Sequence, residues 1–450
     1  MKCLVGIDDT DSSSGFCTTY LAFRLASLRP TNGFRVVAYP RLVRLNPNIP
    51  FKTRGNAAVC LVLEVEDTDA AFESICSLTT ELSDLSNGAN TGVVFLNNLV
   101  LLPLFNRIYR AALNGLVNKE KVKRQLRSRG VLTYELGNGM GIVGASASLA
   151  FDESYDHTYE LIAYRKRESW GRERSIDGDS VLRMDRFTFP HTFNNYDYEK
   201  RKPLITPHGP DPVFLGIRGD SPQIALKAFS MLEYSEEIEG RMIYVSNQCT
   251  DAHLGTALKL PLKAYSSGNI EGILDSVNLD AGGHVYLTVS TRKHKVRAAV
   301  YKPTGNLQRA ARHLVPGDRI IISGGVRKPS DKHDKIVNVE RIRILSLAPV
   351  TKTSSPFCER CKSRMKSEGR GKGFQCERCG NKAPHAKRIT KTIQRELLPG
   401  YYLASPRANR HLTKPLIRYG VNSAGHRYPL IDAWISAGAL TPLRALVSSH

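Results

Sequence analysis

The chain has 450 residues, of which 41% are hydrophobic, and carries 64 Lys and Arg against 42 Asp and Glu, giving a formal net charge of +22. This balance excludes a fibrous or disordered chain, and the length predicts three or four domains rather than a single core. A large positive charge attracts polyanions, which favours a nucleic-acid partner. The sequence shows no run of 18 apolar residues and no signal-peptide pattern, so nothing in it indicates a membrane.

The first 130 residues have the pattern of an α/β domain. Residues 3–7 predict a short buried strand and residues 18–28 predict a helix. Residues 8–17 therefore form a strand-to-helix loop, a place where proteins often bind phosphates. Further elements are expected downstream: strands at residues 34–39 and 57–66, and helices at residues 69–82 and 118–129.

The loop after the first predicted strand is acidic. Asp8, Asp9 and Asp11 place three carboxylates within four positions. One or two Mg²⁺ ions prefer such carboxylates together with substrate phosphates. Acidic loops are also ordinary turns and helix caps, so the loop alone leaves its function open. The chain has no Walker A motif, which disfavours a P-loop kinase.

Residues 131–262 are interpreted as a second catalytic domain, with a strand at residues 158–164. The Gly-rich stretch at residues 137–144 superficially resembles a dinucleotide-binding loop. No acidic residue follows about 20 positions later in a convincing strand, so close backbone packing near the nucleotide is the favoured interpretation. His208 and His253 are expected to be hydrogen-bond anchors rather than acid or base groups.

Residues 263–348 show short β-rich runs with the spacing of a small barrel, and we predict an OB fold. A generic β-sandwich is the alternative, but it does not account for the basic residues 292–295 at one strand junction. The expected strands are residues 285–290, 295–301, 319–325 and 335–344.

Residues 354–385 predict a zinc ribbon. Two CERC motifs, separated by 14 residues, supply Cys358, Cys361, Cys376 and Cys379. Four thiolates can converge tetrahedrally on Zn²⁺ and leave no position for water, so the metal should be structural. The other five cysteines are scattered singly, which fits a reducing cytoplasm rather than a secreted disulfide framework.

The positive charge is concentrated near the ribbon. Residues 351–418 contain 17 basic and 4 acidic residues. With few aromatic residues among them, contacts to the RNA backbone are expected rather than base readout. The last segment, residues 386–450, is basic and interrupted by prolines, and we expect it to fold against the rest of the chain or onto RNA.

A series of motifs is similar to those of the archaeal tRNA(Ile) agmatinylcytidine synthetases. They occur in the family's order over nearly the whole chain, which is stronger evidence than any one of them. The motifs are GIDDTDS (6–12), CTTY (17–20), RLNPNIP (44–50), KTRGN (52–56), FNN (193–195), PHGPDPV (207–213), GIRG (216–219), SNQ (246–248), TDAH (250–253), SPR (405–407) and HLTKPL (411–416).

The resemblance implies an ATP-dependent ligase that modifies tRNA. The 2-carbonyl oxygen of the wobble cytidine in a CAU-anticodon isoleucine tRNA would be phosphorylated and then displaced by the amine of agmatine. It also implies an unusual α/β kinase domain (1–130) and a ferredoxin-like domain (131–262), ahead of the OB fold and the zinc ribbon.

Roles for individual residues follow from the same resemblance and from the chemistry of their side chains. Thr18 matches a threonine that becomes phosphorylated. Asp8, Asp9 and Asp11 would bind metal and polarise the attack, and Lys52, Arg54 and Asn56 are the candidates for binding ATP and its phosphates. The guanidinium of agmatine requires a carboxylate partner, for which Asp211 and Asp220 are the candidates; alternatively, Asp211 only shapes its Pro-rich loop and Asp220 pairs with Arg218.

Two other classes of function compete with this interpretation. A non-enzymatic OB-fold and zinc-ribbon protein would bind nucleic acid but would leave the acidic loop unexplained. A metal-dependent nuclease would use the carboxylates, but it would account for Lys52 and Arg54 no better than a kinase does.

Overall fold

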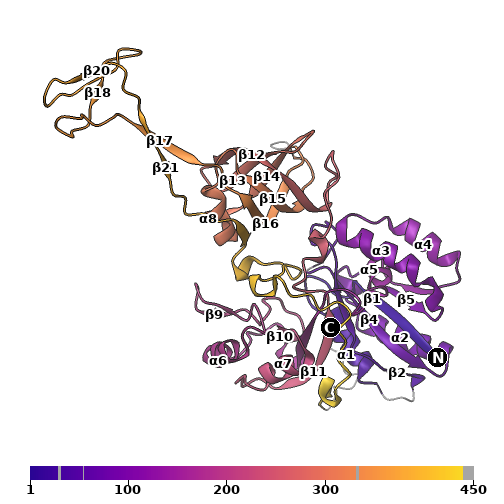
Figure 1. Cartoon of the computed structure of the whole chain (residues 1–450). Helices are drawn as coiled ribbons and strands as arrows, with labels where there is room; N and C mark the ends of the chain where they lie inside the picture. The colour runs from indigo at the N-terminus through magenta and orange to yellow at the C-terminus, as the bar shows by residue number, and fades with distance from the viewer. Residues whose placement is uncertain (29–31, 54, 331–333, 439–450) are drawn as a thin grey trace.

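The computed structural model describes residues 1–28, 32–53, 55–330 and 334–438. It shows an α/β body, a β-barrel beside the body and a small ribbon carried outward on a stalk (Figure 1). Among the described residues, no helix is both long enough and apolar enough to cross a membrane.

The body is built on one mixed sheet of ten strands. The main path through it runs β10-β7-β11-β3-β4-β1-β5-β6, while β2 pairs with β4 and β23 pairs with β11. The strands are β1 (Lys2–Asp8), β2 (Phe34–Val36), β3 (Arg41–Arg44), β4 (Ala57–Val65), β5 (Gly92–Leu96), β6 (Leu132–Glu135), β7 (Thr158–Arg165), β10 (Val213–Gly219), β11 (Ile238–Ser246) and β23 (Ile435–Ala437).

Helices cover both faces of this sheet, so the body has three layers. Because side chains alternate along a strand, β1 sends Leu4 into one core and Val5 and Ile7 into the other. The core that contains Val5 packs against α1 (Thr18–Ala26) and α2 (Thr68–Glu81). The core that contains Leu4 packs against α3 (Leu102–Asn114), α4 (Lys119–Arg127), α5 (Ile142–Ser148), α6 (Gly178–Thr188) and α7 (Pro222–Phe229).

The sheet joins the two segments predicted to be separate catalytic domains. Strand β11 runs parallel to β3, with Val245 opposite Arg41 and Ser246 opposite Leu42. Strand β6, which follows residue 130, pairs with β5 of the first segment. The division at residue 130 stays a prediction, since strands from both sides of it share one sheet.

Five strands form the barrel. They pair in the order β14-β13-β12-β15-β16, and a parallel pairing between β14 and β16 closes the ring. Helix α8 lies between β14 and β15 in the sequence and packs into the same core. The elements are β12 (Ser267–Leu279), β13 (Val285–Ser290), β14 (Lys295–Val300), α8 (Asn306–Arg312), β15 (Arg319–Val326) and β16 (Val337–Ser346).

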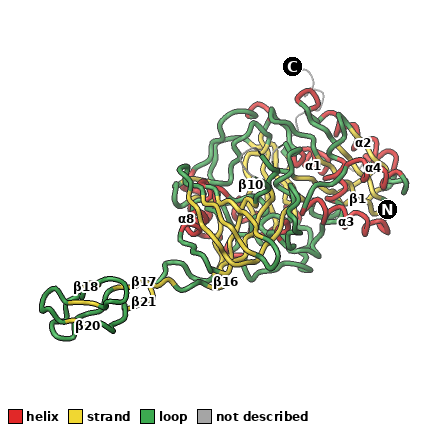
Figure 2. The backbone as a smooth tube through the Cα atoms, turned by 90° about the horizontal axis from the view of Figure 1, so that it is seen from above, coloured by secondary structure: helices red, strands yellow, loops and turns green. Residues whose placement is uncertain are grey.

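The ribbon lies at the end of a two-stranded stalk and projects away from the barrel in both views (Figures 1 and 2). Strands β17 (Val350–Ser354) and β21 (Ile389–Ile393) form the stalk. The ribbon itself is a small sheet of β18 (Lys366–Ser367), β19 (Phe374–Gln375) and β20 (Lys382–Ala383). A separate short hairpin in the body pairs β8 (Tyr196–Asp197) with β9 (Lys202–Pro203).

The chain returns from the ribbon to the rest of the molecule. Strand β22 (Gly400–Leu403) pairs with β16 of the barrel, and β23 then pairs with β11 of the body. The described part of the C-terminal segment therefore folds against the rest of the chain, one of the two outcomes expected from its sequence.

The local sequence patterns predicted many of these elements. The strands expected at residues 3–7, 57–66, 158–164 and 285–290 correspond to β1, β4, β7 and β13, and the helices expected at residues 18–28, 69–82 and 118–129 correspond to α1, α2 and α4. The strand expected at residues 34–39 is shorter and ends at Val36.

Candidate active site and metal site

The four ribbon cysteines converge as their spacing predicts. The sulfur atoms of Cys358 and Cys379 lie 3.5 Å apart, and those of Cys361 and Cys376 lie 3.4 Å apart. All four lie within 4.8 Å of one another, which fits a tetrahedral Zn²⁺ site. In the described part of the chain, these four are the only group of at least three His, Cys, Asp or Glu side chains close enough to hold an ion.

The backbone forms the same turn in both cysteine motifs. The amide of Lys362 donates to the carbonyl of Cys358, and the amide of Gly380 donates to the carbonyl of Cys376. Both donors have left-handed φ values, 58° at Lys362 and 67° at Gly380. The turns direct the paired thiols to one side, so the ribbon is preorganised to bind the metal.

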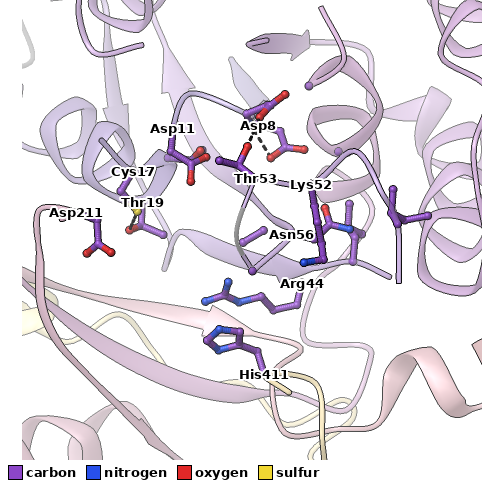
Figure 3. Close-up of a pocket in the computed structure, with 18 of the residues that line it drawn as sticks. Asp8, Asp11, Cys17, Thr19, Arg44, Lys52, Thr53, Asn56, Asp211 and His411 are labelled. Atoms are coloured by element: carbon purple, nitrogen blue, oxygen red, sulfur yellow. Dashed lines mark hydrogen bonds between the residues drawn. The ribbon is translucent and has the colours of Figure 1, made fainter. Parts of the chain in front are cut away.

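The body contains a cavity of about 620 Å³. The loop after β1, the start of α1, the end of β3, residues 49–57, residues 204–213 and His411 of the C-terminal segment all contribute to its lining. Figure 3 shows that Asp8 and Asp11 occupy one side of this cavity and that Arg44 and His411 occupy the opposite side. The cavity brings together seven of the predicted site residues: Asp8, Asp9, Asp11, Thr18, Lys52, Asn56 and Asp211.

Asp8 is fixed at the acidic side by close packing. A Cβ added at Gly144 would overlap a carboxylate oxygen of Asp8, so only glycine leaves room for that side chain. The packing expected for residues 137–144 is thus confirmed for Gly144. Burial, together with the neighbouring Asp9 carboxylate, raises the pKa of Asp8 well above its usual value.

Asp9 and Asp11 complete the acidic side. Asp9 has a left-handed φ of 60°, and its carboxylate accepts a hydrogen bond of 3.1 Å from the Thr53 hydroxyl. Burial raises the pKa of Asp9 to about 6. The charges of Asp9 and Asp11 both raise the pKa of Asp8, so these carboxylates repel one another, and a cation bound with a substrate phosphate would relieve that repulsion.

Thr18 is the first residue of α1 and is 4% exposed. Its hydroxyl lies 3.0 Å from the Thr10 hydroxyl. Thr18 lines the same cavity as Asp8, Asp9 and Asp11.

The side chains of Arg44, Lys52, Arg218 and His411 also line the cavity. Burial lowers the pKa of Arg44 to about 10, and burial and the charge of Arg410 lower the pKa of Lys52. Nε of Arg218 lies 3.1 Å from the carboxylate of Glu160, a buried residue of β7.

Two of the three predicted phosphate-binding residues are described. Lys52 lines the cavity, and Asn56 does so with its side-chain amide donating to the Asn46 carbonyl at 2.7 Å. Arg54 lies outside the described residues.

The two candidates for agmatine recognition lie in different surroundings. Asp211 lines the cavity, where its carboxylate lies 3.3 Å from Arg174 and accepts from the amide of Val213 at 3.0 Å. Asp220 is not among the lining residues, and its carboxylate lies 3.2 Å from Nε of Arg418 rather than against Arg218.

The two histidines noted in the sequence differ in position. His253 is fully buried, and its Nε2 lies 3.0 Å from the carboxylate of Glu340 in the barrel, in agreement with the expected anchoring role. His208 lines the cavity.

Sequence reasoning assigned no role to Arg44, Glu160 or His411. Arg44 and His411 lie in motifs that carried the family resemblance, which was the available signal. Their positions are 367 residues apart, and no local pattern brings them together.

Comparison with protein families and structures agrees with this architecture. Residues 4–67 match the model of the TiaS TCKD domain, residues 139–253 match the TiaS FLD domain, and residues 355–397 match the TiaS C-terminal zinc ribbon domain.

Whole-chain relatives extend these matches. The chain is 40% identical over 421 residues to the isoleucine-tRNA 2-agmatinylcytidine synthetase TiaS of Cenarchaeum symbiosum (strain A), covering 93% of each chain. The crystal structure of TiaS in complex with its isoleucine tRNA and ATP superposes with a TM-score of 0.83 at 35% identity, over 93% of this chain and 97% of that one. For the TiaS complex with the same tRNA, AMPCPP and agmatine, the TM-score is 0.81 at 32% identity, with the same coverage.

Proposed function

The chain belongs to the isoleucine-tRNA 2-agmatinylcytidine synthetase (TiaS) family, and from this we propose that it uses ATP to join agmatine to the wobble cytidine of a CAU-anticodon isoleucine tRNA. The observation that carries the proposal is one cavity lined by Asp8, Asp9 and Asp11 and by Arg44, Lys52 and Arg218, in which Asp8 and Asp11 lie opposite Arg44. A cavity divided in this way can hold a phosphate between a carboxylate-bound cation and basic side chains.

The chemistry requires such a division. The 2-carbonyl oxygen of cytosine is a poor leaving group until it is phosphorylated, and the phosphoryl group carries negative charge that must be neutralised as it transfers. Mg²⁺, when bound, would supply part of that neutralisation through one or two of the carboxylates of Asp8, Asp9 and Asp11. Lys52, Asn56 and Arg54 are proposed to bind ATP and its phosphates.

Thr18 is the proposed acceptor of a phosphoryl group during the cycle. Thr18 lines the cavity at the start of α1, and its hydroxyl is hydrogen-bonded to the hydroxyl of Thr10. The location beside the carboxylates supports this role, because those groups and a bound cation would hold the phosphate near the hydroxyl.

Asp211 is the proposed partner of the agmatine guanidinium. It lines the cavity, and Arg174 holds its loop by donating to the carbonyl oxygens of Pro207 and Gly209. Asp220 is the second candidate, but it would have to share its carboxylate with Arg418.

The architecture also supports assignments of the individual domains. The closed five-stranded barrel with a helix between its third and fourth strands supports an OB fold for residues 263–348. We assign residues 1–130 to a kinase-like domain, 131–262 to a ferredoxin-like domain, 354–385 to the zinc ribbon and 386–450 to the basic C-terminal segment. A cytoplasmic location stays a prediction from cysteine usage.

Mass spectrometry of a CAU-anticodon isoleucine tRNA tests the proposal. After incubation with protein, ATP and agmatine, the wobble cytidine should gain the mass of agmatine less one water. A cleaved tRNA would support the metal-dependent nuclease instead. An unchanged tRNA that still binds would support the non-enzymatic binding protein.

A further inference from the structure

His411 reaches the cavity from the C-terminal segment, far from the other lining residues in sequence. The backbone around it is tied to residues that follow β11. The carbonyl of His411 accepts from the Cys249 amide at 2.9 Å, and the carbonyl of Leu412 accepts from the Asp251 amide at 2.8 Å. The position of the imidazole is therefore fixed by a loop of the body and not by the stalk or the ribbon.

The hydrogen bonding of the ring determines which nitrogen carries the proton. Nη2 of Arg218 lies 3.0 Å from Nδ1 of His411. A guanidinium can only donate, so Nδ1 must be the acceptor. In a neutral ring the proton is then on Nε2, which leaves an N–H donor for the cavity.

Charges around the ring favour the neutral form. The positive charge of Arg44, then burial, and then the charges of Arg218 and Lys52 lower the pKa of His411 well below its usual value. The ring thus contributes a hydrogen bond without adding a further positive charge to this side of the cavity.

Gly55 packs closely against Arg44 and His411 where all three line the cavity. An added Cβ at Gly55 would lie 2.5 Å from Nη1 of Arg44 and 3.3 Å from Nε2 of His411. The buried Nε of Arg44 has no hydrogen-bond partner in the part of the chain that the structure describes. Arg44 therefore carries a donor without an acceptor at a position where its side chain lines the cavity beside His411, and an anion in the cavity can complete such an arrangement.

We propose that His411, through Nε2–H and together with Arg44, forms a phosphate-binding site in front of Gly55, which the C-terminal segment completes. This inference rests on the proposed function, in which both the nucleotide and the RNA bring phosphates to the cavity. Either can supply the bound oxygen, and the experiment below separates them.

Two substitutions of the same residue test the assignment. His411→Gln keeps an N–H near the position of Nε2 but loses the acceptor for Arg218. His411→Asn keeps an acceptor near Nδ1 but cannot reach the position of Nε2. We expect His411→Asn to weaken binding at least about tenfold, the size of one lost hydrogen bond to a charged group, and His411→Gln to retain affinity within about threefold.

Binding is measured in two arms, one for each source of phosphate. Thermal unfolding checks that both variants fold. Calorimetry with a non-hydrolysable ATP analogue in the absence of tRNA reports on nucleotide phosphate, and filter binding of tRNA without nucleotide reports on RNA phosphate. A loss of affinity for either ligand that is confined to His411→Asn supports the site. The ligand that is affected identifies the source of the phosphate. His313→Gln and His313→Asn, at an exposed histidine after α8, are the matched controls.

Three results would overturn the proposal. Both His411 variants could bind both ligands as tightly as wild type, or both could lose affinity equally. A loss of affinity confined to His411→Gln would mean that the ring only holds Arg218. Gly55→Ala provides a second test, because its methyl group would occupy the proposed site and should also weaken binding. Failure of the proposed function would give a different result: wild-type protein would leave the tRNA unmodified, whatever the two binding measurements show.

Discussion

The α/β body and the zinc ribbon are stabilised in different ways. The body has two extensive apolar cores, one on each face of its sheet. The buried cluster of the ribbon consists of Cys358, Met365, Phe374 and Cys376, so two of its four members are metal-binding thiols. A segment with so small a core depends on its metal for folding, whereas the body does not.

The same two regions differ in their charge. In the cavity of the body, Asp8 and Asp11 lie opposite Arg44, which suits the transfer of a phosphoryl group. The ribbon and its stalk present Lys352, Lys366 and Lys391 on projecting, largely exposed strands, which suits contact with a polyanion. Catalysis and RNA binding should therefore be separable by substitution.

The largest expected effect is on catalysis. Asp8→Asn and Thr18→Ala should each lower the rate of cytidine modification at least about 100-fold, because they remove a cation-binding carboxylate and the proposed phosphoryl acceptor. Single-turnover assays measure the rate, and filter binding should show tRNA affinity within about twofold of wild type. Glu64→Gln, at an exposed carboxylate of the same sheet, is the control. A marked loss of tRNA affinity in Asp8→Asn with ATP turnover retained would contradict the separation.

The next effect is on RNA binding. Cys358→Ser should release zinc, unfold the ribbon and weaken tRNA binding by about 30-fold at low salt, with a smaller loss at high salt because phosphate contacts release counterions. Metal analysis and salt-dependent filter binding measure both changes, while ATP hydrolysis without tRNA should persist. Cys76→Ser, at a half-buried thiol of α2, should change neither the zinc content nor the tRNA affinity. Wild-type zinc content and affinity in Cys358→Ser would assign the ribbon another role.

A smaller effect is expected on the amine substrate. Asp211→Asn should raise the agmatine concentration needed for half-maximal rate about tenfold, since about 1.4 kcal/mol of a charge-assisted contact is lost. Arg174→Gln removes the ion pair and the hydrogen bonds by which Arg174 holds the loop, but the Asp211 carboxylate is retained. If both variants raised the agmatine requirement equally, the effect would belong to the loop and not to a contact with agmatine.

The smallest effect concerns stability of the body alone. The Asp67 carboxylate caps α2 by accepting from the amides of Asp69 and Ala70 at 3.0 and 3.1 Å. Asp67→Ala should lower the free energy of unfolding of the body by about 1 kcal/mol in urea titrations, with zinc content unchanged. Glu73→Ala, at an exposed position of the same helix, should have less effect; an equal loss would argue against the cap.

Local patterns in the sequence account for much of the fold. The alternation of buried residues in β13 and the CERC spacing each depend on neighbours within a short stretch of chain. Helix α3 was not predicted, although its apolar residues have helical spacing, and Pro103 near its start is typical of a helix N-terminus. The sharing of one sheet by β3 and β11 depends on a pairing between positions about 200 residues apart, which local patterns do not contain.

The candidate site also combines residues that local spacing brings together with contacts between distant positions. Asp8, Asp9, Asp11 and Thr18 lie within one loop and the turn after it, so their convergence was predicted from spacing. The pairing of Asp220 with Arg418 and the approach of His411 to Arg218 join positions nearly 200 residues apart. Those contacts follow from the path of the C-terminal segment, which composition alone left undetermined.

The return of this segment to the body also has a consequence for synthesis on the ribosome. Every carboxylate of the cavity is translated early, but the chain must pass through the barrel, the stalk and the ribbon before residue 411 is made, and β23 pairs with β11 later still. A nascent chain released after the barrel would hold Asp8 and Thr18 in place without the imidazole that faces them. We therefore expect such truncated products to lack an intact phosphate-binding site, so that full activity becomes available only once translation has carried the chain past its RNA-binding region.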